Sequence, residues 1–335
     1  MPQPAEIDQL VDELLRLFRA AQDEIERQLA AIVDEEQQAR RVRRLRELQR
    51  TVDAEMRMLA DRSARWLESA YPRVYELGAQ QGAGSLGADF SWSQTSVEAV
   101  QRLAADTFSQ VLAATEFVSD QAKAWIREAA RRQTALSLIE GRTATQAGRQ
   151  LGRELAAGQL ADALGGPVGM IRYADGSLHR LDDYAEMLMR TSTAQAFNAG
   201  TLDQMAAFGV KYCEALDGVG CGLTSHDDGA AVNGRVFPIE VANAHPLAHP
   251  NCRRSWIGRP DIETADAAKR AKPSTTAAQR ADQAQAEADR AAMVERRAQA
   301  RSARADRTPA TARPSRDGRT ARSARTPRSG VAPSP

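Results

Sequence analysis

The chain has few of the residues that interrupt helices or cross-link a fold. Its first glycine is Gly78, and no proline occurs between Pro4 and Pro72. A stretch of that length without helix breakers predicts long helices. Cysteine is scarce as well: the chain has 3, an odd number, and all lie between Cys213 and Cys252. This clustering argues against a disulfide framework and for reduced thiols.

Long apolar runs are also missing. No window approaches the roughly 18 to 20 consecutive apolar residues that span a bilayer. The opening segment MPQPAEIDQL is acidic and lacks the apolar region of a signal peptide. We therefore expect a soluble protein that is made in a cytoplasm and makes no membrane contact.

The net charge of +1 conceals an asymmetry. From Lys269 to the C-terminus the chain holds 16 Lys and Arg against 6 Asp and Glu, and the remainder holds 29 against 38. An acidic body thus carries a basic tail, predicted as an Ala/Arg-rich, low-complexity and largely disordered region over residues 263–335. The tail either contacts nucleic acid through phosphates, without reading bases, or remains a solvated extension.

Residues 1–165 are predicted to form a helical assembly region. Apolar side chains recur every three or four positions from Ile7 to Leu77, which is typical of helices that pair with each other or with a partner. The glycines of 78–89 predict a flexible connector after these helices. The arginine-rich passage 40–50 either contacts nucleic acid or, because glutamates flank it, forms a solvated helical face.

Further helices are expected in the second half of this region. The apolar spacing predicts one helix over 96–115 and a separate one that carries Trp125. Thr143 is a candidate N-cap for a helix through Leu155, with Gln146 three residues later as in a capping box.

Residues 166–262 are predicted to form a small α+β module. Two short strands, 170–173 and 179–181, flank a tight turn, and Asp182 or Asp183 is expected to cap a helix through Asn198. On that helix Arg190 either binds an anion or pairs with a nearby carboxylate.

A further strand, 210–216, is expected to lead into a turn-rich segment that contains an Asn233-Gly234 hairpin signal. This segment contains two short-spaced pairs of potential metal ligands. Cys221 and His226 form the first pair, and His249 and Cys252 form the second. Two such pairs on separate turns suit tetrahedral zinc, which would replace a missing apolar core.

The same residues also fit a site without metal, in which the cysteines are small buried apolar groups and the histidines belong to loops. Cys213 and His245 are substitute candidates for the ligands. The interpretation as a structural zinc site therefore stands beside a simpler one.

The ending HPNCRR, together with Asn233-Gly234 and the run Cys221 to Asp228, resembles the C-terminal signature of the phage Mu F-like minor capsid proteins, also called head morphogenesis proteins. The segment Tyr173 to Gly200, with Arg190-Thr191 and Asn198 on its helix, resembles the same group. The resemblance covers roughly residues 168–260 and is most specific at 249–253. The family's more familiar form has a Cys-x2-Cys pair where this chain has Cys221 and His226.

The resemblance implies a structural protein of a tailed bacteriophage and no enzymatic activity. The expected partners are the phage portal, the major capsid protein or both, with self-association through the N-terminal helices and weak DNA contact through the tail. The expected location is the virion, in the capsid interior or at the portal vertex, after assembly in the host cytoplasm.

Two other functions remain open from the residues alone. In the first, a metal-dependent nuclease or another phage-delivered enzyme uses a catalytic metal site formed by His226, Asp227, Asp228 and His249, with Asp227 or Asp228 orienting the water. In the second, the protein binds DNA non-specifically and has no capsid role. The expected fold class is α+β and predominantly α: long N-terminal helices, then a small α+β module with a zinc-stapled loop region, then a disordered basic tail.

Overall fold

The computed structural model describes residues 4–33, 35, 38–138, 143–164, 166–173, 176–218 and 220–274. All of these residues belong to one structural unit, Met1–Ala284. The remainder of the predicted basic tail, from Thr275 on, lies outside the described residues. In the described part of the chain, no helix combines the length and the apolar content needed to cross a membrane.

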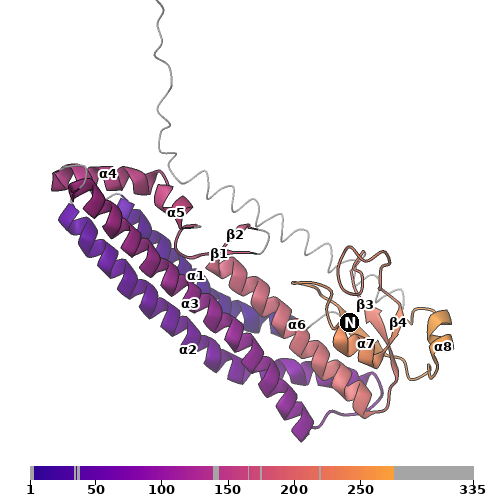
Figure 1. The fold of residues 1–335 in the computed structure, drawn as a ribbon. Coiled ribbons are helices and arrows are strands. Elements are labelled where there is room, and N and C mark those ends of the chain that lie inside the picture. The colour runs from indigo at the N-terminus through magenta and orange to yellow at the C-terminus, as the bar shows by residue number, and fades with distance from the viewer. Residues whose placement is uncertain are drawn as a thin grey trace, which may run out of the picture. The chain divides into compact units, whose positions relative to one another are not determined.

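Four long helices form the bulk of the unit (Figure 1). They are α1 (Ala5–Val33), α2 (Gln38–Gly84), α3 (Gln94–Leu138) and α6 (Leu181–Ala207). We call them the helical bundle. α2 packs against each of the other three, and one apolar cluster that extends from Ile7 to Phe197 fills the space between them. The predicted fold class, predominantly α with long N-terminal helices, is therefore confirmed.

Two predicted helix ends in the bundle are wrong. The expected connector at 78–89 is helical as far as Gly84, and the two helices expected after it are the single helix α3. The glycines inside α2 allow close contact with α6 and do not end the helix. A Cβ added at Gly78 would collide with the carbonyl oxygen of Phe197, and one added at Gly200 would collide with that of Tyr75.

The arginine-rich start of α2 makes contacts within the chain. Arg41 is buried, and its Nε donates to the carbonyl oxygen of Ile32 at the end of α1. Arg44 pairs with Glu35 at 3.1 Å. These two arginines therefore stabilise the turn between α1 and α2.

A short helical pair and a hairpin connect α3 to α6. α4 (Ala144–Ala156) begins with the predicted capping box of Thr143 and Gln146, and α5 (Gln159–Ala163) follows it. β1 (Met170–Arg172) and β2 (Leu178–Arg180) then form the predicted antiparallel hairpin. The expected cap of the next helix is wrong: α6 begins directly after β2 with Arg180 as its N-cap, and no side chain accepts the first free N–H groups.

The remaining elements form what we call the sheet module, residues 210–274. They are β3 (Tyr212–Leu216), β4 (Val236–Pro238), α7 (Ile239–Ala244), β5 (Ser255–Gly258) and α8 (Ala265–Arg270). The strands pair antiparallel in the order β4-β3-β5. A second, smaller apolar cluster from Leu202 to Trp256 forms the core of this module.

The Asn233-Gly234 signal forms a turn but not a two-residue hairpin. Gly234 has φ 75°, and Arg235 N donates to Val232 O at 2.9 Å. β3 ends at Leu216 and β4 begins at Val236, so the two strands are joined by a long loop and not by the two residues of this turn. The long loop between β3 and β4 is therefore free to carry polar side chains.

Candidate metal centre

Two loops of the sheet module meet because of how its central strand is paired. Leu216, at the end of β3, pairs with Ser255, at the start of β5. The next residues outward, Asp217 and Arg254, therefore face each other across the two strands. The loop that follows β3 leaves from this point, and the loop that precedes β5 arrives at it.

Two groups of potential ligand atoms share the sulfur of Cys221. The ligand atoms of Cys221, His226 and His249 all lie within 4.8 Å of one another, and so do those of Asp217, Cys221 and Cys252. The structure thus brings together three of the residues predicted as ligands and places Cys252 beside the first of them. Thiol, imidazole and carboxylate groups this close can hold a metal ion. We call these five residues the donor cluster.

A hydrogen bond of His249 determines which of its ring nitrogens is free. Nδ1 lies 2.8 Å from the carbonyl oxygen of Pro250, an acceptor that requires the proton to be on Nδ1. Nε2 then presents its lone pair toward the sulfur of Cys221, 3.5 Å away. Carbonyl partners of this kind hold metal-binding imidazoles in the tautomer that binds. His249 therefore has its free nitrogen directed into the donor cluster.

Arg254 is fully buried and joins the two loops. Its Nε donates to Asp217 Oδ2 at 2.8 Å. Its Nη1 donates to the carbonyl oxygens of Leu223 and His245 at 2.9 and 3.0 Å, and its Nη2 donates to that of Gly222. A buried guanidinium with this many partners fixes the loops on both sides of the donor cluster.

The surroundings of Cys221 keep its thiol protonated unless a cation lies near it. Burial raises the pKa of the Cys221 thiol to about 12, and the carboxylate of Asp217 and the thiol of Cys252 raise it further by unfavourable charge interaction. The thiol of Cys252 lies 3.7 Å from Asp217 Oδ1. Arg254 neutralises Asp217, so two thiolates would have no compensating charge unless a divalent cation lies between them. The groups of the donor cluster could therefore hold a metal ion.

The helix α6 holds the loop that precedes β5 through two hydrogen-bonding side chains. Thr191 Oγ1 accepts from the backbone N–H of Asn251 at 3.0 Å. Asn251, between the two ligand candidates of this loop, has φ 62°, a left-handed conformation that asparagine tolerates better than most residues. About two turns further along α6, Asn198 Nδ2 donates to the carbonyl oxygens of Pro246 and Arg254 at 3.0 and 2.8 Å. The loop therefore has a fixed backbone.

The substitute ligand candidates lie elsewhere. Cys213 is buried in the apolar cluster of the sheet module, and its thiol lies 3.8 Å from the carbonyl oxygen of Phe237. His245 contributes its backbone oxygen to Arg254. Neither residue belongs to a group of metal-ligand atoms in the part of the chain that the structure describes.

Asp228, the second acidic residue after His226, has contacts within its own turn. The carboxylate of Asp228 accepts from the backbone N–H and the hydroxyl of Thr224 and from the backbone N–H of Ser225. These hydrogen bonds, of which the Thr224 N–H is the strongest, lower the pKa of Asp228. Arg190, the other candidate for an ionic role, pairs with Glu186 at 3.2 Å.

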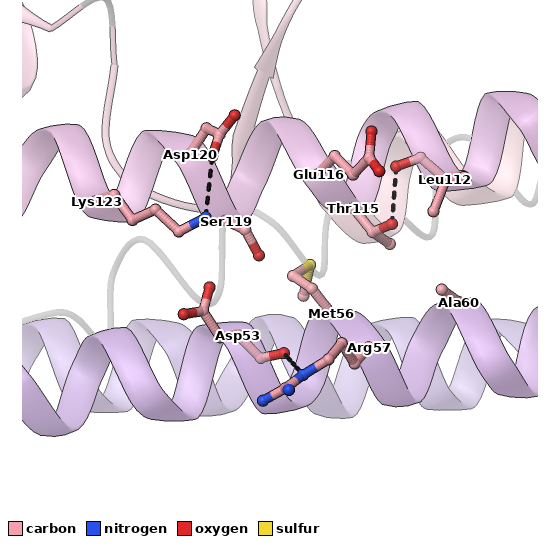
Figure 2. A pocket seen from close by; sticks show the side chains of 10 residues that line it. All are labelled: Asp53, Met56, Arg57, Ala60, Leu112, Thr115, Glu116, Ser119, Asp120 and Lys123. Carbon is pink, nitrogen blue, oxygen red and sulfur yellow. Dashed lines mark hydrogen bonds and ion pairs between the residues drawn. The ribbon is translucent and has the colours of Figure 1, made fainter.

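The helical bundle has a groove of its own between α2 and α3, with a volume of about 520 Å³. Figure 2 shows side chains of both helices directed toward one another across it. Both of its cationic side chains have local partners: Lys123 pairs with Asp120 at 3.1 Å, and Arg57 Nε donates to the carbonyl oxygen of Asp53. No histidine or cysteine is among the residues that line it: Asp53, Met56, Arg57, Ala60, Leu112, Thr115, Glu116, Ser119, Asp120 and Lys123.

Sequence reasoning missed Asp217 and gave no role to Arg254. Both follow from strand pairing, since each is the first residue beyond a paired strand end. The one available signal was the arginine doublet Arg253-Arg254 directly after Cys252, and the sequence does not indicate which of the two arginines is buried. No protein-family model, curated protein or solved structure matches the chain.

Proposed function

We propose that this protein is a structural minor capsid or head morphogenesis protein of a tailed bacteriophage, and not an enzyme. One observation supports this proposal above others: the residues that carry the resemblance, although distant in sequence, converge on one place. His249 and Cys252 of the HPNCRR ending belong to the donor cluster, and Arg254 of the same ending donates to its Asp217. Thr191 and Asn198, from the other part of the resemblance, hold the same loop. A chance similarity of sequence gives no reason for these residues to lie close together in the structure.

The ion proposed for the donor cluster is zinc, with Cys221, His226, His249 and Cys252 as its ligands. Two thiolates and two imidazoles are a preferred tetrahedral set for zinc and leave no open position in a structural site. Bound there, zinc would link the two loops of the sheet module and contribute to its folding free energy.

The proposed partner surface lies on the helical bundle. α3 exposes three large apolar side chains, Val97, Leu112 and Phe117, with exposed fractions of 37%, 36% and 46%. Exposed apolar groups along one helix support a role in binding another protein. The proposed partners are the portal, the major capsid protein or a second copy of the chain, within the virion. The basic tail is proposed to contact packaged DNA through phosphates.

Co-sedimentation with assembled particles tests this function. Full-length protein is mixed with portals or procapsids of its phage, and bound protein is measured after gradient centrifugation. Phe117→Glu should reduce the bound fraction, whereas Phe208→Glu, at an equally exposed position outside α3, should not. Absence of the protein from washed virions by mass spectrometry would refute the proposal.

A nuclease function has less support, because the oxygens of Asp228 accept hydrogen bonds from Thr224 and Ser225. Metal-dependent DNA cleavage that is lost in Asp228→Ala would nevertheless establish it. DNA binding through the tail alone predicts that affinity, measured against salt, disappears when the chain ends at Ser274. That end point keeps the bond from the Ser274 N–H to Glu214 at 2.8 Å.

A further inference from the structure

The four proposed ligands are not held equally. Cys221 is 6% exposed, and its backbone is fixed by hydrogen bonds to Gly218 and from Val232, at 3.3 and 3.0 Å. Cys252 is 2% exposed, and its backbone N–H donates to the carbonyl oxygen of His249 at 3.1 Å. Burial and these backbone hydrogen bonds therefore restrict the movement of both cysteines.

His249 is fixed through its ring and its loop. Its Nδ1 is bonded to the carbonyl oxygen of Pro250 at 2.8 Å, and the neighbouring Asn251 is bonded to Thr191 of α6 at 3.0 Å. Together with the two cysteines, it forms a set of three donors whose positions the rest of the fold determines.

His226 differs from these three. It is exposed and lies in a turn stabilised by Asp228, which bonds to Thr224 and Ser225 but not to the His226 ring. The ring stacks on that of His249, with 4.1 Å between ring centroids. In the part of the chain that the structure describes, the imidazole of His226 has no hydrogen bond to hold its orientation. A rotation of this side chain into solvent breaks only the stacking contact.

Among the described residues, Asp217 is the other donor grouped with the two cysteines, and it already accepts two hydrogen bonds. Its Oδ2 accepts from Arg254 at 2.8 Å, and its Oδ1 accepts from the backbone N–H of Gly218 at 2.8 Å. Binding of a metal through Oδ2 would compete with the fully buried Arg254, and binding through Oδ1 would compete with the Gly218 N–H; both are costly. A replacement for His226 must therefore come from the solvent.

We infer that His226 is the exchangeable ligand of this centre and that an imidazole or thiol donor from solution occupies its coordination position when it leaves. This inference rests on the proposed metal site. It gives the centre an accessible fourth position, so that a histidine or cysteine side chain of another protein has the chemistry to bind there.

The test uses full-length protein loaded with Co²⁺, whose visible absorption reports the number and type of ligands. His226→Ala should still bind Co²⁺, with a lower affinity than the wild type and a changed visible spectrum. Addition of free imidazole should restore the wild-type spectrum. His249→Ala should lose more affinity than His226→Ala, and imidazole should not restore it.

His245→Ala is the matched control, because this histidine lies outside both groups of ligand atoms. It should bind Co²⁺ like the wild type. Loss of Co²⁺ from His226→Ala as complete as that from Cys252→Ser, or a spectrum of His226→Ala that imidazole leaves unchanged, overturns the inference while the metal site stands. Failure of the wild type itself to bind Co²⁺ overturns the metal site and this inference together.

Discussion

In the helical bundle, the largest fully buried side chains are apolar or aromatic, with Phe18, Tyr71 and Leu48 among them. In the sheet module, the two largest are Trp256 and the charged Arg254. The bundle has an apolar cluster along its whole length, whereas the module has a smaller one and a buried network of polar groups. The comparison shows two ways to stabilise one chain: broad apolar burial in one region, and a few groups with several partners each in the other.

The two regions should therefore respond differently to single substitutions. Apolar burial is spread over many side chains, so that each contributes a limited share of the free energy of unfolding. A buried charge network depends on every member, because removal of one partner leaves others without hydrogen bonds in a medium that cannot solvate them.

The largest effect is expected for Arg254→Met. This substitution leaves the carboxylate of Asp217 buried without its cation and removes the donors for three carbonyl oxygens. The free energy of unfolding of the module should fall by about 3 to 5 kcal/mol. Hydrogen exchange of the β3–β5 amides measures this loss region by region.

The neighbouring Arg253→Met is the control, since this arginine is exposed. It should change the free energy of unfolding by no more than about 0.5 kcal/mol. Similar losses in the two variants would show that the network around Arg254 does not stabilise the module.

A smaller effect is expected in the bundle for Gly78→Ala. The new Cβ would collide with the carbonyl oxygen of Phe197, so α2 and α6 must move apart along a well-packed contact. We expect a loss of about 1 to 3 kcal/mol, measured by denaturant titration of helical circular dichroism.

Gly84→Ala is the control: it makes the same substitution in α2 where no helix–helix contact is affected, because no atom lies within 4 Å of the added Cβ. Alanine favours helix over glycine, so this variant should be neutral or more stable by up to about 1 kcal/mol. A loss equal to that of Gly78→Ala would assign the effect to helix propensity and not to packing.

The smallest effect concerns an exposed ion pair between α1 and α2. Arg73 donates to both oxygens of Glu6, at 2.7 and 3.1 Å, and these hydrogen bonds lower the pKa of Glu6. Because the folded pKa lies below the unfolded one, the contribution of the pair is present above the ordinary glutamate pKa of about 4.3 and is lost as the pH falls through the folded value. Carboxyl NMR titration should show the Glu6 pKa returning to its ordinary range in Arg73→Met. An unchanged pKa would contradict the pairing.

The sequence predicted the features that depend on residues close together in the chain. The spacing of apolar residues after Ile7 indicated the helices, and Thr143 with Gln146 indicated the capping box, because both signals are local. The end of α2 could not be predicted, since Gly78 is needed for contact with α6, which lies more than 100 residues later in the chain.

The donor cluster could be located only in part for the same reason. Short spacings identified Cys221 and Cys252 as members of ligand pairs, and turn residues placed them on loops. Asp217 and Arg254 become neighbours through the register of β3 and β5, which no local pattern specifies. The predicted division at residue 165 remains a prediction, and α6 contributes side chains to the cores on both sides of it.

The central claim is that a metal ion joins the two loops of the sheet module through the donor cluster. Elemental analysis of full-length protein purified without added metal tests it most directly, with Cys252→Ser and Cys213→Ser analysed in parallel. The account predicts about one zinc per chain in the wild type and in Cys213→Ser, and loss of zinc together with a lower melting temperature in Cys252→Ser. A wild-type protein without metal, whose melting temperature Cys252→Ser leaves unchanged, would contradict the account.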